Sequence, residues 1–187
     1  MDATTDLTGH FLIAMPALED PNFYHTVTLI CQHNDEGAMG VVFNRPLDID
    51  LGEVFKHMEI ETKDKELEKK HVYYGGPVQV ERGFVLHKPD GDWESTMPIS
   101  DELAVTTSRD IIEDIAQGKG PEKFLIALGY AGWEAGQLEY EISENAWLSG
   151  PANIDIIFDT AYDKRWESAA SVIGVDLKLI SGDMGHA

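Results

Sequence analysis

The chain has 187 residues, with 14 Lys and Arg against 34 Asp and Glu, which gives a formal net charge of −20 at pH 7. A charge of this sign repels nucleic-acid phosphates and anionic membrane surfaces, so direct DNA binding and membrane-surface binding are disfavoured. The lone cysteine, Cys31, excludes an internal disulfide and a cysteine-based metal cluster within one chain. We expect one domain over residues 1–187, because this length suits a single hydrophobic core.

The start of the chain and its apolar runs bear on localisation. Residues 1–6 contain Asp2 and Asp6 but no Lys or Arg, whereas a signal peptide begins with basic residues. The apolar runs are shorter than the ~20 residues that a bilayer-spanning helix requires. We therefore expect a cytoplasmic protein.

The first part of the chain is typical of β-strands. Residues 11–15 form a short apolar run before Pro16, and residues 26–32 are rich in β-branched side chains. Turn residues at 34–37 separate this second run from residues 40–43, which predicts an antiparallel hairpin. Two further strands are predicted at 72–74 and 84–86.

Helical spacing appears next. Apolar residues at 51, 54, 55 and 58 predict a short amphipathic helix. Asp50 fits the N-cap of this helix better than a calcium ligand, because residues 48–53 lack the glycine that an EF-hand loop has at its sixth place. Residues 59–70 are rich in charge and predict an exposed loop or a solvated helical extension.

The second half of the chain alternates helices and strands. Residues 107–110 fit a capping box for a helix that ends at Gly118, and the apolar run at 124–128 predicts a central strand buried on both faces. We predict a helix at 137–146, a strand at 154–158, and a last helix that opens with a capping box at 160–163. Hairpin strands followed by this alternation favour an α+β fold.

Known catalytic motifs are absent from the sequence. It contains no G-x-S-x-G elbow, no H-E-x-x-H, no Walker A loop and no C-x-x-C pair. His10, His25 and His33 could supply imidazoles to zinc or copper, but their spacing matches no known ligand pattern, and ordinary hydrogen bonding is favoured. Cys31 shares strand parity with Val27 and Leu29, which favours core packing over a nucleophilic role. We therefore predict no catalytic residues, no metal site and no cofactor.

One stretch of the chain is uniformly acidic. No Lys or Arg occurs between Lys123 and Lys164, although several Asp and Glu do. Such a stretch could attract a basic partner by electrostatic steering, but a solvated acidic face is the favoured interpretation.

Several separate phrases together fit one known pattern. They are GHFLIAMP (9–16), DPNF (20–23), GAMG (37–40), NRP (44–46), YGGPV (74–78), LGYAGW (128–133), GQLE (136–139), WL (147–148), RW (165–166) and GHA (185–187). Over nearly its whole length the chain resembles the AlgH/YqgE family of bacterial proteins. The resemblance implies an α+β fold: a mixed, largely antiparallel, bifurcated sheet with a partly barrel-like core, flanked by helices. Some family members are labelled transcriptional regulators, but the resemblance implies no mechanism and no catalytic residues.

The favoured function is a non-enzymatic regulatory or protein-interaction role, with another protein as the partner. The alternative is an enzyme or small-ligand-binding protein with an unfamiliar site, and a DNA-binding regulator is less favoured. Loops that packing alone does not explain supply the candidate binding residues: Asp20, Phe23, Asn44, Arg45, Gly75, Gly76 and Trp133. We expect these loops to converge around Arg45. Its guanidinium would form bidentate hydrogen bonds with a carboxylate of the partner, or would instead form an internal ion pair with Asp20.

Overall fold

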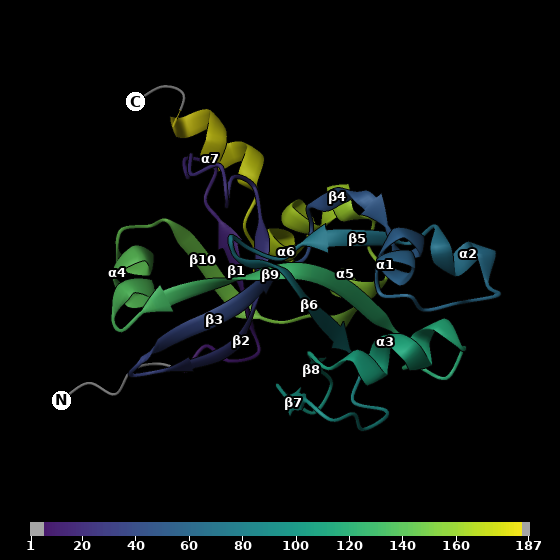
Figure 1. Ribbon diagram of the computed structural model, residues 1–187. Coiled ribbons are helices and arrows are strands. Elements are labelled where there is room, and N and C mark those ends of the chain that lie inside the picture. Colours follow the sequence, from purple (N-terminus) through teal and green to yellow (C-terminus); the bar gives the residue numbers. More distant parts are fainter. Residues whose placement is uncertain (1–5, 185–187) are drawn as a thin grey trace.

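The computed structural model describes residues 6–184, which fold around a branched sheet of ten strands (Figure 1). The acidic start of the chain, apart from Asp6, and the phrase at 185–187 lie outside the described residues. The strands are β1 (His10–Ala14), β2 (Val27–Asn34), β3 (Gly37–Val42), β4 (Pro46–Asp50), β5 (His71–Tyr74), β6 (Val78–His87), β7 (Thr96–Pro98), β8 (Ala104–Thr106), β9 (Phe124–Glu134) and β10 (Trp147–Pro151).

Seven α-helices and one 3-10 turn are described within residues 6–184. They are α1 (Leu51–His57), α2 (Lys65–Glu68), α3 (Arg109–Ala116), α4 (Gln137–Ser143), α5 (Ile154–Phe158), η1 (Tyr162–Lys164), α6 (Arg165–Val172) and α7 (Leu177–Met184). None of these helices is both long and apolar enough to cross a membrane.

The sheet divides at β9, its longest strand. The main path runs β10-β1-β2-β3-β9-β6-β8-β7, and β5 pairs with β9 off this path and carries β4. One edge of β9 pairs with β6. The other edge pairs first with β5, in parallel at residues 127–128, and then with β3, antiparallel at residues 131–134. This fork confirms the expected α+β fold with a bifurcated, largely antiparallel sheet.

Glycines make the fork possible. Gly129 has a φ of +83°, and the β6–β9 register shifts beside it, between Val78 and Gly83. Ala127 and Tyr130 consequently face the same hydrophobic cluster, although strict alternation would place them on opposite faces. A Cβ on Gly75 or Gly76 would overlap the backbone of β9, at the carbonyl groups of Gly129 and Tyr130 respectively. Two chain segments therefore meet here at a distance that only glycine permits.

Helices cover both faces of the sheet (Figure 1). On one face, α5, α6 and α7 pack over a cluster that includes Phe11, Leu29 and Phe84. On the other face, α1, α2 and α3 cover one half, around Ile126. Helix α4 and the segment before β2 cover the other half, around Trp133. Within β9, the run at 124–128 contributes to clusters on both faces, since Leu125 and Ala127 belong to the first cluster and Ile126 to the second, as its continuous apolar sequence predicted.

Most predicted elements of the first half are confirmed. The predicted strands at 11–15, 26–32, 40–43, 72–74, 84–86 and 124–128 correspond to β1, β2, β3, β5, β6 and β9, and β2 and β3 form the predicted hairpin. Asp50 caps α1, because its carboxylate accepts a hydrogen bond from the amide of Glu53 at 3.0 Å. The charged segment 59–70 contains the short helix α2.

The prediction of a strand at 154–158 is wrong, because these residues form α5. The side-chain oxygen of Asn153 accepts from the amides of Asp155 and Ile156 and so caps a helix at this point. Ile156 and its neighbour Ile157 are both buried, which a helix against one cluster allows and a half-exposed strand does not. Strands β4, β7, β8 and β10 and helix α7 were not predicted.

Both predicted capping boxes are also wrong. The N-cap of α3 is Ser108, and its side chain makes no capping hydrogen bond; the hydroxyl instead donates to the carboxylate of Asp110. Helix α6 begins at Arg165, after the turn η1, and the hydroxyl of Thr160 donates to the carbonyl of Asp155. Helix α6 buries Ala169 and Ala170 against the sheet.

The fork generates a stability prediction. Gly76→Ala places a methyl group on the β9 backbone and requires an unfavourable φ of +153°, so we expect it to lower the free energy of unfolding by at least about 2 kcal/mol. Gly132→Ala is the matched control, because a Cβ there makes only an ordinary contact of 3.6 Å with Tyr130. Urea denaturation of both variants measures the difference. Equal stability of the two would contradict the role given to the fork.

Candidate functional site

The segment between β1 and β2 is a tight loop built on Asp20. Its carboxylate accepts a hydrogen bond from the amide of Asn22 at 2.9 Å, and its carbonyl accepts from the amides of Phe23 and Tyr24. The loop ends at His25, which has a φ of +55°. Asn44 holds this end: its side chain accepts from the amide of Val27 at 2.9 Å and donates to the carbonyl of His25 at 3.0 Å.

Arg45 fastens the same loop through backbone carbonyls. Its Nη1 donates to the carbonyls of Pro21 and Asn22 at 2.8 and 3.2 Å, and its Nη2 donates to that of Tyr24 at 2.7 Å. The guanidinium lies 5.4 Å from the centre of the Tyr74 ring. Among residues 6–184, no carboxylate lies within ion-pair distance of Arg45, so the expected ion pair with Asp20 is not formed.

Tyr74 completes the connection between the loops. Its hydroxyl donates to the side-chain oxygen of Asn22 at 3.0 Å, and its amide donates to the carbonyl of Arg45 at 2.8 Å. Partial burial raises the pKa of this phenol, and the nearby charge of Arg45 opposes the rise. The next residue, Gly75, binds Val42 through its carbonyl and Leu128 through its amide.

Phe23 links the loop to a cluster of tryptophans. Its ring lies 6.0 Å from that of Trp133 and 5.3 Å from that of Trp147. Both indole N–H groups donate to one carboxylate oxygen of Glu141, at 3.0 and 2.9 Å. Trp133 is 6 % exposed, so its ring packs in the interior and offers little surface to a partner.

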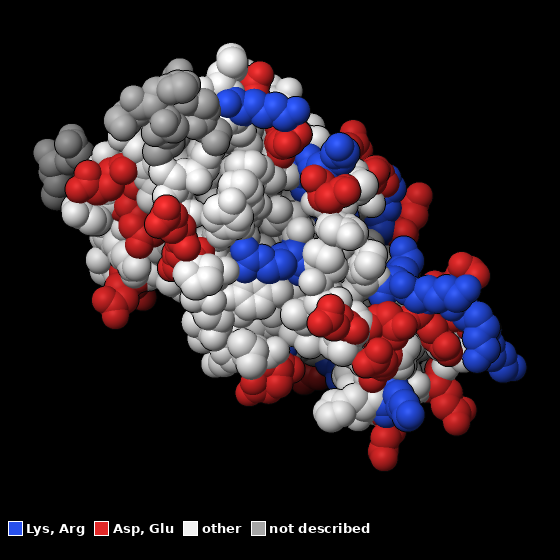
Figure 2. Space-filling model, turned by 90° about the horizontal axis from the view of Figure 1, so that it is seen from above, with Lys and Arg blue, Asp and Glu red and all other residues white. Residues whose placement is uncertain are grey.

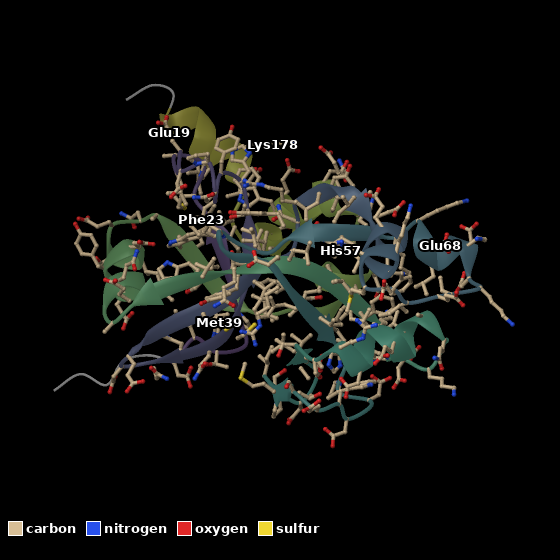
Figure 3. The ribbon with its side chains drawn as sticks, viewed as in Figure 1. Glu19, Phe23, Met39, His57, Glu68 and Lys178 are labelled. Carbon is tan, nitrogen blue, oxygen red and sulfur yellow. The ribbon has the colours of Figure 1, made fainter. Side chains whose placement is uncertain are left out.

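The seven predicted site residues therefore divide into two groups. Asp20, Phe23, Asn44 and Arg45 lie in or against the loop at 20–25 and are partly exposed, and Figure 3 labels Phe23 there. Gly75, Gly76 and Trp133 adjoin this loop or its contacts but are buried, and packing explains them. The structure brings together the four segments that contain these residues, at 20–23, 44–45, 75–76 and 133, while their role in binding stays a prediction.

Two of the histidines considered as metal ligands, His25 and His33, occupy different environments. The Nδ1 of buried His33 accepts from the amide of Leu7 at 3.0 Å, and its Nε2 lies 3.4 Å from Glu139. His25 is stacked between the rings of Tyr24 and Trp166, and burial lowers its pKa. In the part of the chain that the structure describes, no three His, Cys, Asp or Glu side chains come together as a metal site.

Cys31 is the extra residue of a bulge in β2, where the pairing with β3 shifts between Ile30 and Gln32. Its side chain is 2 % exposed, and burial raises the pKa of the thiol to about 12. A thiol of this kind is protonated at neutral pH and is a poor nucleophile.

Cys31 should therefore react slowly with a thiol reagent. In native buffer at pH 8 we expect DTNB to modify it at least about 100-fold more slowly than in denaturant, because modification requires opening of the fold. Absorbance at both conditions gives the two rates. Rapid labelling of the native protein would show an accessible thiolate and return Cys31 to the candidate nucleophiles.

An open groove, which no sequence pattern predicted, lies on the face that α5–α7 cover elsewhere. Its floor is formed by Met39, Phe84, Met97, Val105 and Tyr130, its rim includes Gln32, Glu36, Arg82, Thr107 and Glu134, and its volume is about 810 Å³. These residues come from β2, β3, β6–β9 and adjoining turns, and no helical residue lines the groove. Figure 3 labels Met39 between β3 and the β7–β8 pair.

The rim of the groove continues into an acidic surface. Glu134 pairs in register with Gly37, next to Glu36, and α4 follows with Glu139 and Glu144. The upper face of the molecule, away from β7 and β8, also shows Asp and Glu without Lys or Arg on the side toward α4, whereas its opposite side carries both signs (Figure 2). Arg82 is the one basic residue in the lining, and its guanidinium lies over the Phe84 ring at 5.5 Å.

The contacts of Arg45 predict a structural effect of its removal. Arg45→Ala leaves three carbonyls of the loop at 20–25 without their donors, so we expect unfolding free energy to fall by about 1–2 kcal/mol and the loop amides to exchange faster. Arg82→Ala is the control, because that guanidinium holds no backbone segment in place. Denaturation and hydrogen exchange measure both effects. An unchanged stability for Arg45→Ala would favour a binding role over a structural one.

Comparisons with known proteins agree with this structure. A family model described as AlgH-like matches residues 11–178. A UPF0301 protein of Thioalkalivibrio sulfidiphilus is 58 % identical over 187 residues, 100 % of each chain, and one of Nitrosococcus oceani is 57 % identical over 179 residues, 96 % of each. The solution structure of the Pseudomonas aeruginosa AlgH protein is similar, with a TM-score of 0.80, 48 % identity and coverage of 97 % of this chain and 96 % of that one. A crystal structure of a Corynebacterium diphtheriae protein shares the fold, with a TM-score of 0.76 at 22 % identity, over 97 % of this chain and 94 % of that one. The chain belongs to the AlgH-like family of uncharacterised UPF0301 proteins.

Proposed function

We propose that the protein is a non-enzymatic cytoplasmic regulatory protein that binds a basic, partly apolar segment of another protein in the groove beside β3 and β6–β9. The observation that carries the proposal is the combination of an apolar floor with an acidic rim in one open hollow of about 810 Å³. The floor would take aliphatic or aromatic side chains, and the rim would take Lys or Arg.

The charge of the groove supports a basic partner. Neither Glu36 nor Glu134 forms an ion pair with another residue of the described part of the chain, so both carboxylates are available. A protein with a net charge of −20 also attracts a basic segment at long range and accelerates the encounter. The same charges repel nucleic-acid phosphates, which supports a protein partner over DNA.

The floor supports binding of a flexible segment. Met39 and Met97 are partly exposed side chains that pack against the buried cluster beneath. Methionine adapts its shape to different apolar partners, and the binding surfaces of regulatory proteins use this property.

The test introduces charge at Gly132, which lines the groove and has room for a side chain. A photo-reactive amino acid at Met39 would first identify the bound segment in cells, and calorimetry with the purified partner would follow. We expect Gly132→Arg to bind at least about tenfold more weakly than Gly132→Glu, because the two side chains are of similar size but opposite in sign. Added salt should weaken binding to the wild type.

Gly83→Leu is the control. Gly83 lines a separate hollow of about 530 Å³ beside α1 and α3, and a Cβ there meets no atom within 4 Å. This variant fills space elsewhere on the same sheet and should bind the partner as the wild type does. Equal binding by Gly132→Arg and Gly132→Glu, or capture of an acidic segment, would overturn the proposal.

A further inference from the structure

Arg165, the first residue of α6, carries a buried charge. Arg165 is only 6 % exposed. Its side chain crosses the interior to Phe43, directly after the end of β3. Its Nε donates to the carbonyl of Thr160 at 2.9 Å, and its Nη1 donates to the carbonyl of Phe43. The guanidinium also lies 5.0 Å from the centre of the Tyr73 ring.

No anion balances this charge within residues 6–184. No carboxylate of the described residues lies within ion-pair distance of Arg165, although the chain has 34 Asp and Glu. A guanidinium has five N–H donors, and the two hydrogen bonds above leave about three of them, on Nη1 and Nη2, without an acceptor. Nη2 is not among the buried polar atoms without a partner, so it is open to solvent and can contact a ligand. A largely buried charge without a counter-charge is costly, and a bound anion would lower that cost.

A cavity of about 230 Å³ adjoins this side chain. Besides Arg165, its lining contains Lys69, Lys70 and His71, and it contains no Asp or Glu. Four basic residues thus surround one hollow in a protein whose net charge is −20. Lys69 has a partner in Glu66 at 3.4 Å, whereas the ammonium of Lys70 lies 5.2 Å over the Phe124 ring.

The remaining walls of the cavity are apolar. They are formed by Leu51, Tyr73, Phe124, Leu125, Ile126, Ile157 and Phe158. A carboxylate has one polar end, which fits the planar guanidinium fork, while the rest of the molecule is apolar.

We propose that this cavity binds a small carboxylate with a short apolar or aromatic body. The carboxylate lies against the Nη1–Nη2 edge of Arg165, with Lys70 and His71, both exposed, at the mouth. The body packs against Phe124 and Phe158, which are both partly exposed. The site shares no lining residue with the groove, so it does not depend on the proposed protein partner.

Benzoate is a suitable probe, with benzamide as its neutral analogue and inorganic phosphate as a polar anion. We expect benzoate to bind saturably in an NMR titration and to shift the Nε–H resonance of Arg165 and the amides of β5 and α5. Benzamide should bind at least about tenfold more weakly, because it cannot neutralise the guanidinium. Phosphate should bind more weakly than benzoate, and tighter binding of phosphate would overturn the choice of a carboxylate.

Charge variants locate the site. Lys70→Glu lies at the mouth and is exposed, so it should fold normally and weaken benzoate binding several-fold. Lys178→Glu makes the same change of charge on α7, which Figure 3 shows on a different part of the molecule, and should leave binding unchanged. Equal effects of the two variants would show that benzoate responds only to the net charge of the protein, and would overturn the proposal.

Arg165→Gln tests the central contact. It removes the charge and keeps a polar side chain, and the dispersion of its NMR spectrum shows whether the variant is folded. A folded Arg165→Gln that still binds benzoate as the wild type does would overturn the proposal. If the variant is unfolded, two other comparisons test the proposal. They are Lys70→Glu against Lys178→Glu, and benzoate against benzamide.

Discussion

The close contact between the segment at 75–76 and β9 is the constraint on which the rest of the fold depends. Gly75 binds β3 through its carbonyl and β9 through its amide, each at 2.8 Å, so three strands meet at this residue. Gly129, with its positive φ, lies opposite the extra residues of β6 between Val78 and Gly83 and reverses the side-chain pattern of β9, which turns Tyr130, Gly132 and Glu134 toward the groove. The branched sheet, the placement of Tyr74 beside Arg45 and the open groove all require this backbone contact.

Two arginines illustrate how similar contacts lead to different functional interpretations. Arg45 and Arg165 both donate to backbone carbonyls and both lie over a tyrosine ring. Arg45 is half-buried, and its three hydrogen bonds hold one loop. Arg165 is buried, keeps free donors and adjoins a cavity with a basic lining. Burial without a counter-charge, and not the arginine itself, makes Arg165 the stronger candidate for ligand binding.

Local patterns in the sequence predicted the local parts of the fold. Alternating or continuous apolar runs located the strands of the first half, and the Asp50 cap followed from side-chain chemistry. The prediction of a strand at 154–158 is wrong because five apolar-rich residues fit a buried strand and a buried helix equally well. The side chain of Asn153 caps the helix and so favours it. Gly75, Gly76 and Trp133 are predicted binding residues, and close backbone packing and an indole–carboxylate hydrogen bond give them a structural role as well, so their role in binding stays a prediction. The groove and the basic cavity had no local signal, because each is assembled from strands, helices or turns that are distant in sequence.

Charge is segregated along β9, and this explains how one acidic protein can offer sites of opposite preference. The first residues of the strand, from Phe124 to Ile126, form a wall of the cavity that contains Arg165, Lys70 and His71. Beyond Gly129, the same strand ends at Glu134 on the acidic rim of the groove. A net charge of −20 describes the long-range field, which steers an approaching partner. Within a partly enclosed cavity the nearest groups dominate, because fewer water molecules screen them than on an open surface, and this supports the proposal of a small anion there despite the sign of the whole protein.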